Sequence, residues 1–188
     1  MKKSLGAGTF AEPTPLWCVG SYDEEGKPNV MAAAWGGICC SKPPCVTVSV
    51  QKIRHTYDSI MKRKAYTVSV PSAQYAKEAD YFGIASGKNT DKFEKTGLTP
   101  VKSELVDAPY VKEFPLIIEC EVIHVYDIGL HTLFIGEIMD IKADEEILGE
   151  NGKIDTVKLS PVIFGPGSRY YYNVSGKIGP AFQIGNEA

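Results

Sequence analysis

The sequence predicts a mainly β protein, an antiparallel barrel into which α-helices are inserted. Three observations lead to this class. About six segments carry strand patterns, most of them are joined as hairpins, and the helical segments follow strands without alternating regularly with them. A doubly wound sheet would need that alternation, whereas antiparallel barrels are built from hairpins. We expect one domain over residues 1–188, with no linker or internal repeat.

The first half of the chain predicts one hairpin and two further strands. The apolar runs 16–22 and 30–37 flank the turn DEEGKPN, so they predict a hairpin that ends at Trp35. Segment 46–51 (VTVSVQ) alternates valine with polar residues, and segment 65–71 (AYTVSVP) repeats the pattern until a proline ends it. Both are therefore expected to be half-buried strands.

Helical patterns separate these strands from a second, longer hairpin. RHTYDSIMKRK predicts a helix with Thr56 as its N-cap, AQYAKEADYF predicts another, and DKFEK predicts a single helical turn. Residues 115–129 and 130–145 are long apolar segments around a turn, which predicts a hairpin of bent barrel strands. A last strand is expected at 169–174.

Composition excludes several classes of function. The 20 basic and 23 acidic residues give a net charge of −3, which argues against a nucleic-acid-binding protein. No apolar run approaches the roughly 18 residues of a membrane span, and the N-terminus lacks the apolar region of a signal peptide. We therefore expect no nucleic acid or membrane partner and a cytoplasmic localisation.

Familiar chemical motifs are absent or incomplete. The five cysteines form no CxxC pair, so we expect small buried side chains and neither a disulfide framework nor a zinc site. GAGTFA at residues 6–11 follows no strand, and GPGSRY at 165–170 leads into a strand, so neither is a dinucleotide fingerprint. The three histidines have no metal-ligand spacing. We expect no metal.

Three features together point to a nucleotide-like cofactor. The run AAAWGG leaves small side chains beside Trp35, which would form a flat slot. RHTY places Arg54 and Thr56 at a helix start, where free N–H groups attract anions. Lys92 follows a glycine-flanked segment and could reach the same anion.

Each of these residues also has an ordinary structural explanation. Trp35 and Phe164 would be core aromatics, Thr56 a helix cap, Lys92 a solvated surface lysine, and His131 a partner of loop backbone groups.

Beyond these features, the chain resembles the flavin reductase-like FMN-binding split barrels, and within them the flavoredoxin branch. The ordered motifs that carry the resemblance are NVMAAAWGG, PPCVTVSV, RHTYDSI, TVSVP, SGKNTDKFEKTGL, HTLFIGEI and YYYNVSGKIGPAF, which cover most of residues 15–183. The resemblance implies a six-stranded antiparallel Greek-key split β-barrel with inserted α-helices. It also implies a homodimer with one FMN per subunit, bound non-covalently near the dimer interface.

The resemblance further implies which residues bind the cofactor. The matching positions are Asn29, Met31, Trp35, Val50, Gln51, Arg54, His55, Thr56, Lys92, His131 and Phe164. The first three would line the flavin, and the backbone of residues 50–51 would face the isoalloxazine edge. Residues 54–56 and Lys92 would hold the phosphate, while His131 and Phe164 would lie beside the ring.

The function that the resemblance implies is electron transfer by a bound FMN that cycles between oxidised and reduced states. A redox partner protein or NAD(P)H would donate the electrons, and no catalytic acid or base is required of the chain because the chemistry belongs to the cofactor. Two alternatives stay open: an NAD(P)H:flavin oxidoreductase acting as a flavin or ferric reductase, and a flavin-binding module without turnover. Whether the protein is an enzyme is therefore also open.

Overall fold

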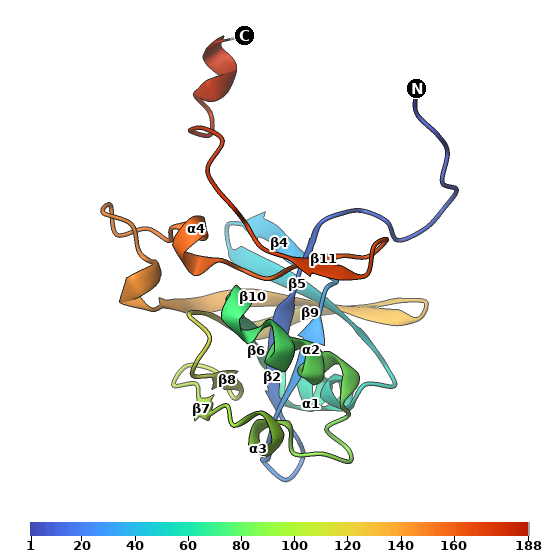
Figure 1. Ribbon diagram of the computed structural model, residues 1–188. Coiled ribbons are helices and arrows are strands. Elements are labelled where there is room, and N and C mark those ends of the chain that lie inside the picture. Colours follow the sequence, from blue (N-terminus) through green and yellow to red (C-terminus); the bar gives the residue numbers. More distant parts are fainter. Residues whose placement is uncertain (188) are drawn as a thin grey trace.

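The computed structural model describes residues 1–187, and its centre is one sheet of seven antiparallel strands (Figure 1). These strands are β2 (Trp17–Tyr22), β3 (Pro28–Ala33), β4 (Gly36–Ser41), β5 (Pro44–Gln51), β6 (Ala65–Val70), β9 (Leu116–Ile128) and β10 (His131–Ala143). Their order across the sheet is β3-β2-β6-β9-β10-β5-β4. The predicted antiparallel β architecture with inserted helices is confirmed, although the main sheet has seven strands and not six.

The seventh strand is β4, which forms a hairpin with β5. Its sequence GGICCS has no alternation of apolar and polar residues, and most of it is exposed, so its burial gave no pattern to detect. Pairing with β5 holds it at the sheet edge.

Cys39 and Cys40 are exposed on this strand, so the expectation that the cysteines are buried is wrong for these two. It is correct for Cys18, Cys45 and Cys120.

The two predicted hairpins are both present. Strands β2 and β3 pair around the turn at residues 23–27, and β3 ends at Ala33, two residues before the predicted end. Strands β9 and β10 pair over their whole length with two register shifts, which bend them as expected of barrel strands.

Five short strands complete the β structure. They are β1 (Thr14–Pro15), β11 (Ile163–Gly165) and β12 (Tyr170–Tyr172) in one small sheet, and β7 (Pro100–Lys102) and β8 (Pro109–Val111) in another. The predicted last strand at 169–174 is thus observed as the shorter β12.

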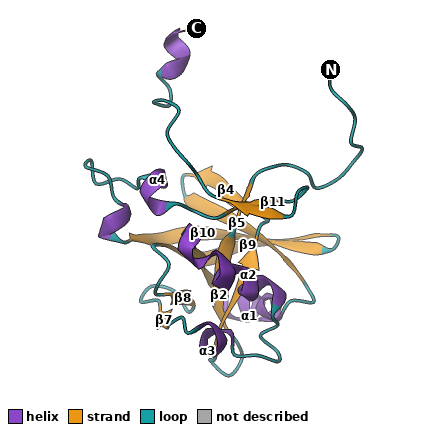
Figure 2. Cartoon of the chain, in the orientation of Figure 1, coloured by secondary structure: helices purple, strands orange, loops and turns teal. Residues whose placement is uncertain are grey.

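The helices lie on both sides of the long β9–β10 hairpin (Figure 2). They are α1 (His55–Arg63), α2 (Ala76–Ile84), α3 (Lys92–Thr96) and α4 (Thr156–Leu159), with 3₁₀ turns η1 (Ala73–Tyr75), η2 (Glu145–Ile147) and η3 (Ile184–Glu187). The second predicted helix is therefore a 3₁₀ turn followed by α2. Within residues 1–187, no helix has both the length and the apolar character needed to cross a membrane.

Two hydrophobic cores meet at the sheet. The barrel interior is filled by side chains such as Val48, Tyr66 and Phe134, while Phe82, Phe93 and Phe114 pack between the sheet and helices α2 and α3. Strand β6 is buried along its entire length, so the prediction of a half-buried strand is wrong there. The reason is that β8 packs over its outer face, where Thr67 donates a hydrogen bond to the Pro109 carbonyl at 2.5 Å.

The small residues around Trp35 mainly leave room for neighbouring side chains and backbone to pack closely. A methyl group at Gly36 would lie 2.7 Å from the Trp17 ring and 2.8 Å from the Thr47 carbonyl oxygen, so the indole of Trp17 lies directly on this glycine. Ala33 is buried in the barrel core. The carbonyl of Trp35 accepts a hydrogen bond from the Ser49 N–H at 2.8 Å, which joins the turn to β5.

This packing predicts a difference between two adjacent glycines. Gly36→Ala should lower the free energy of unfolding by about 1–3 kcal/mol, because the added methyl group overpacks the Trp17 contact. Gly37→Ala is the matched control, since a methyl group there meets nothing within 4 Å. Urea unfolding of both variants measures the difference, and equal midpoints would show that the Trp17 contact does not require glycine.

Candidate functional site

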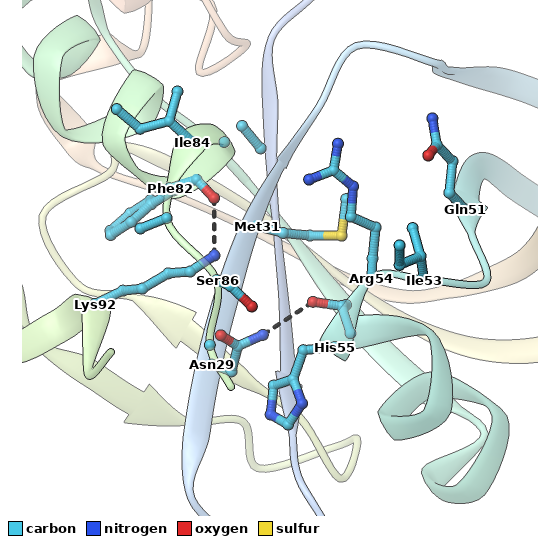
Figure 3. Close-up of a pocket in the computed structure, with 15 residues that line it drawn as sticks. Asn29, Met31, Gln51, Ile53, Arg54, His55, Phe82, Ile84, Ser86 and Lys92 are labelled. Atoms are coloured by element: carbon cyan, nitrogen blue, oxygen red, sulfur yellow. Dashed lines mark hydrogen bonds between the residues drawn. The ribbon is translucent and has the colours of Figure 1, made fainter. Parts of the chain in front are cut away.

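A cavity of about 410 Å³ opens where β3, the end of β5, the start of α1 and the loop after α2 come together (Figure 3). This volume lies within the range of small-molecule sites. The lining residues are Asn29, Met31, Ala32, Gln51, Ile53, Arg54, His55, Thr56, Phe82, Gly83, Ile84, Ala85, Ser86, Gly87 and Lys92. The cavity therefore combines polar and apolar walls from four parts of the chain.

The N-terminus of α1 forms one polar wall. The helix begins at His55, so Arg54 is the capping residue and the prediction of Thr56 as N-cap is wrong. No side chain caps this end. The first N–H groups of a helix have no intrahelical acceptor, and they attract anions. The cavity thus receives an uncapped helix terminus.

A buried hydrogen bond orients the hydroxyl of Thr56. Asn29 Nδ2 donates to Thr56 Oγ1 at 2.9 Å, and both side chains are buried. Because the hydroxyl oxygen already accepts this bond, its own proton is left to be donated elsewhere. The pair also fixes β3 against α1 at the edge of the cavity.

Two cations face the same space. Lys92 is only 4% exposed, so the interpretation as a solvated surface lysine is wrong. Its ammonium donates to the carbonyls of Val30 at 2.7 Å and Phe82 at 2.8 Å, which leaves one of its three donors. Burial, together with the nearby charge of Arg54, lowers the pKa of Lys92 to about 8.

Arg54 differs from Lys92 because its side chain is exposed at the cavity mouth. Among residues 1–187 its guanidinium makes no hydrogen bond or ion pair with another side chain or with the backbone. The five donors of this group are thus available to a ligand.

The rest of the cavity is largely apolar. Met31, Ile53 and Ile84 project into it from three different segments, and Figure 3 shows Met31 between Phe82 and Arg54. A cavity that combines apolar side chains with cations and free helix N–H groups suits a ligand with a flat hydrophobic part and an anionic end.

The structure brings together seven of the predicted site residues. Those that line the cavity are Asn29, Met31, Gln51, Arg54, His55, Thr56 and Lys92. Trp35, Val50, His131 and Phe164 do not line it. The Val50 side chain is buried in the barrel core, although its backbone adjoins Gln51. His131 pairs with Gln51 across β10 and β5, whereas Phe164 lies on β11 with its ring 5.6 Å from that of Tyr171. The roles predicted for these four residues remain predictions.

Sequence reasoning missed segment 83–87, the end of α2 and the start of the following loop, which supplies five lining residues. A methyl group at Gly87 would lie 2.8 Å from His55 Cδ2 and even closer to the Asn29 amide oxygen, so this backbone rests directly on the polar wall. The sequence offered one signal for this segment, because Gly83 and Gly87 follow the predicted helix and allow the backbone to approach other residues closely. Among residues 1–187 no group of three or more His, Cys, Asp or Glu side chains is arranged to hold a metal ion.

Comparison with known proteins agrees with the motifs. The family described as "Flavin reductase like domain" matches residues 9–171. The structure of flavoredoxin of Desulfovibrio vulgaris (Miyazaki F) is 56% identical, with a TM-score of 0.94 over 98% of this chain and 100% of that chain. Flavoredoxin from Methanosarcina acetivorans is 28% identical, with a TM-score of 0.92 over 100% of this chain and 98% of that one.

A more distant relative is named as an enzyme. Ferric-chelate reductase (NAD(P)H) of Archaeoglobus fulgidus is 30% identical over 111 residues, which are 57% of this chain and 64% of the relative. The family match spans most of the chain, and the first flavoredoxin is similar over its whole length. The chain therefore belongs to the flavin reductase like family, and within it is flavoredoxin-like, as the motifs predicted.

Proposed function

We propose that this flavoredoxin-like protein binds FMN in the cavity at the start of α1 and transfers electrons through it. One observation carries the proposal. The uncapped α1 terminus, the Thr56 hydroxyl, Arg54 and Lys92 all line one cavity, and apolar side chains line the rest of it. FMN ends in a phosphate monoester and carries a flat ring, so its two parts match the anion-binding groups and the apolar side chains of this cavity.

The phosphate end has the donors that a dianion requires. Helix N–H groups, the free proton of Thr56 and the donors of Arg54 would form charge-assisted hydrogen bonds, which are stronger than neutral ones. Lys92 has one donor left for a ligand, and its positive charge also favours an anion such as a phosphate. A terminal phosphate can use all of these groups at once, which favours FMN over FAD, whose phosphates lie within the molecule.

The apolar wall would hold the ring. Met31, Ile53 and Ile84 would exclude water from it, and the backbone at Gln51 would contact its edge. When bound, FMN supplies one- and two-electron chemistry, and the chain supplies position and electrostatics. Cations and N–H groups near the flavin favour its reduced, more negative form.

A second candidate is an NAD(P)H:flavin oxidoreductase. The similarity to a ferric-chelate reductase favours this activity, because that relative is named for NAD(P)H as donor. A flavin-binding module without turnover is the third. Both alternatives use the same cavity, so they differ from the first in kinetics and not in the site.

We also propose that the protein is a homodimer and that its electron donor is a redox partner protein or NAD(P)H. Support for the dimer comes from exposed apolar side chains on the outer part of the β9–β10 hairpin, including Ile123, Tyr126, Ile128 and Leu130. Burial of such side chains against a second copy would stabilise an assembly. Light scattering that gives the mass of a single chain would contradict this.

The proposed function predicts a coloured protein. Freshly purified protein should show a flavin absorption spectrum, and heat should release about one FMN per chain. Rapid mixing with NADH or NADPH then separates the candidates. Slow bleaching by nicotinamide with fast exchange to a redox protein is expected, whereas rapid bleaching would assign the reductase. A colourless protein that takes up neither added FMN nor FAD would exclude all three.

The phosphate wall can be tested by substitution. Arg54→Ala and Thr56→Ala should each weaken FMN binding by about 1.5–3 kcal/mol, because each removes a hydrogen bond to a charged group. Lys95→Ala is the matched control, since Lys95 is an exposed cation on α3 that does not line the cavity. Fluorescence titration of flavin-free protein gives the affinities. Equal affinities in all three variants would place the phosphate elsewhere.

The lowered pKa of Lys92 predicts a dependence on pH. Its pKa is about 8 in the folded protein and near 10.4 in an unfolded chain, so between these values the unfolded chain holds the extra proton. The free energy of unfolding of the flavin-free wild type should therefore rise with pH in this window, by up to about 2–3 kcal/mol relative to Lys92→Met. FMN affinity should fall over the same window. Urea unfolding at pH 7.5 and 9.5 measures the first effect, and parallel behaviour of wild type and variant would contradict it.

A further inference from the structure

Two cysteines face each other at the edge of the main sheet. In the β4–β5 hairpin, Cys40 lies directly opposite Cys45, and Ser41 opposite Pro44 closes the ladder beside a two-residue loop. Directly opposed residues in antiparallel strands have Cα atoms about 4.5–5.5 Å apart. Disulfides need about 4.4–6.8 Å. The backbone therefore already has the spacing of a cross-strand disulfide.

The register also distinguishes Cys40 from its neighbour. A register shift between Ile38 and Cys40 leaves Cys39 as the extra residue of a bulge, without an opposed partner on β5. Cys39 and Cys40 are both exposed, but only Cys40 is aligned with Cys45.

The two aligned thiols differ in access. Cys40 is exposed on an edge strand, so an external reagent can reach it. Cys45 is 2% exposed, and its thiol donates to the Pro43 carbonyl at 3.4 Å. Burial raises the pKa of the Cys45 thiol, and the neighbouring Cys40, Cys39 and Glu137 raise it as well. The two aligned cysteines thus differ in access, because Cys40 is exposed and Cys45 is buried.

We propose that Cys40 and Cys45 form a reversible disulfide, which makes the β4–β5 hairpin a site of thiol–disulfide exchange separate from the cavity. The separation follows from β5 itself. Cys45 precedes Gln51 by six residues, which in an extended strand is about 20 Å. The exchange therefore needs no contact with the ligand of the cavity.

The oxidant is a low-molecular-weight disulfide such as oxidised glutathione. The Cys40 thiolate attacks one of its sulfur atoms, and the other half leaves as a thiolate. Cys45 then loses its proton to solvent and attacks the Cys40 sulfur, which displaces the second half. The protein loses two electrons and two protons, and the external disulfide becomes two thiols.

The resulting bond would be easy to reduce again. Cys40 and Cys45 are separated by only four residues, so the crosslink closes a very short loop and constrains the unfolded chain little. Weakly stabilising, exposed disulfides have oxidising potentials and belong to the labile class. These properties favour exchange over a permanent structural crosslink.

The test uses the full-length protein as purified, reduced and then freed of reductant. After treatment with oxidised glutathione, alkylation in denaturant should label three thiols in place of five. The intact mass should fall by two hydrogen atoms with no glutathione retained. Cys40→Ser should abolish this change, and Cys39→Ser, the matched control, should keep it. The reaction should also become faster between pH 7 and 9, because the Cys45 thiol must ionise.

Other outcomes would overturn the proposal. They are five labelled thiols after oxidation, loss of the disulfide in Cys39→Ser but not in Cys40→Ser, or a covalent dimer on a non-reducing gel. Cys45→Ser should also abolish the mass change, and if this buried variant does not fold, the exposed variant Cys40→Ser still decides the result. The readout is mass and thiol count, so failure here leaves the flavin proposal untouched, and a colourless protein leaves this one untouched.

Discussion

The site depends on one buried cation. Lys92 places its ammonium between the Val30 carbonyl on β3 and the Phe82 carbonyl on α2, and so ties α3, α2 and the sheet to one point. Burying an unpaired charge is unfavourable, and two neutral carbonyls compensate it only in part. Arg54 adds a second positive charge to the same cavity. An anion in the cavity would relieve both effects, so the charges of the lining residues imply the sign of the ligand.

The surrounding elements follow from this arrangement. Phe82 carries the carbonyl bound by Lys92, and its ring packs against Phe93, the residue next to Lys92, with centroids 6.0 Å apart. The loop that continues from α2 is thereby held over β3, where Gly87 contacts Asn29. Asn29 in turn orients Thr56. A chain of contacts thus links the buried ammonium to the helix terminus, so the chain's own side chains position the polar residues of the cavity.

The sequence allowed the strands with alternating valines and the two hairpins to be predicted, because period-2 burial and turn residues are local signals. Strand β4 was not predicted, because it is a strand through its pairing with β5 and its own sequence has no strand pattern. Only those cavity residues that lie within recognisable sequence motifs were predicted. Thr56 was assigned to the wrong helix position, although it lies in the site. The burial of Lys92 and the position of segment 83–87 depend on how α2 and α3 pack on the sheet, which no local sequence pattern records.

Strand β5 explains how one small barrel can keep two chemistries apart. Its inward side chains Val46, Val48 and Val50 are all fully buried in the barrel core, so the strand is fixed along its length. One of its ends presents Gln51 to the cavity, and the other presents Cys45 to the edge strand. Because close-packed cores resist displacement, a crosslink at one end transmits little movement to the other. The packing that buries the Val50 side chain therefore also separates the cavity from the thiols of Cys40 and Cys45.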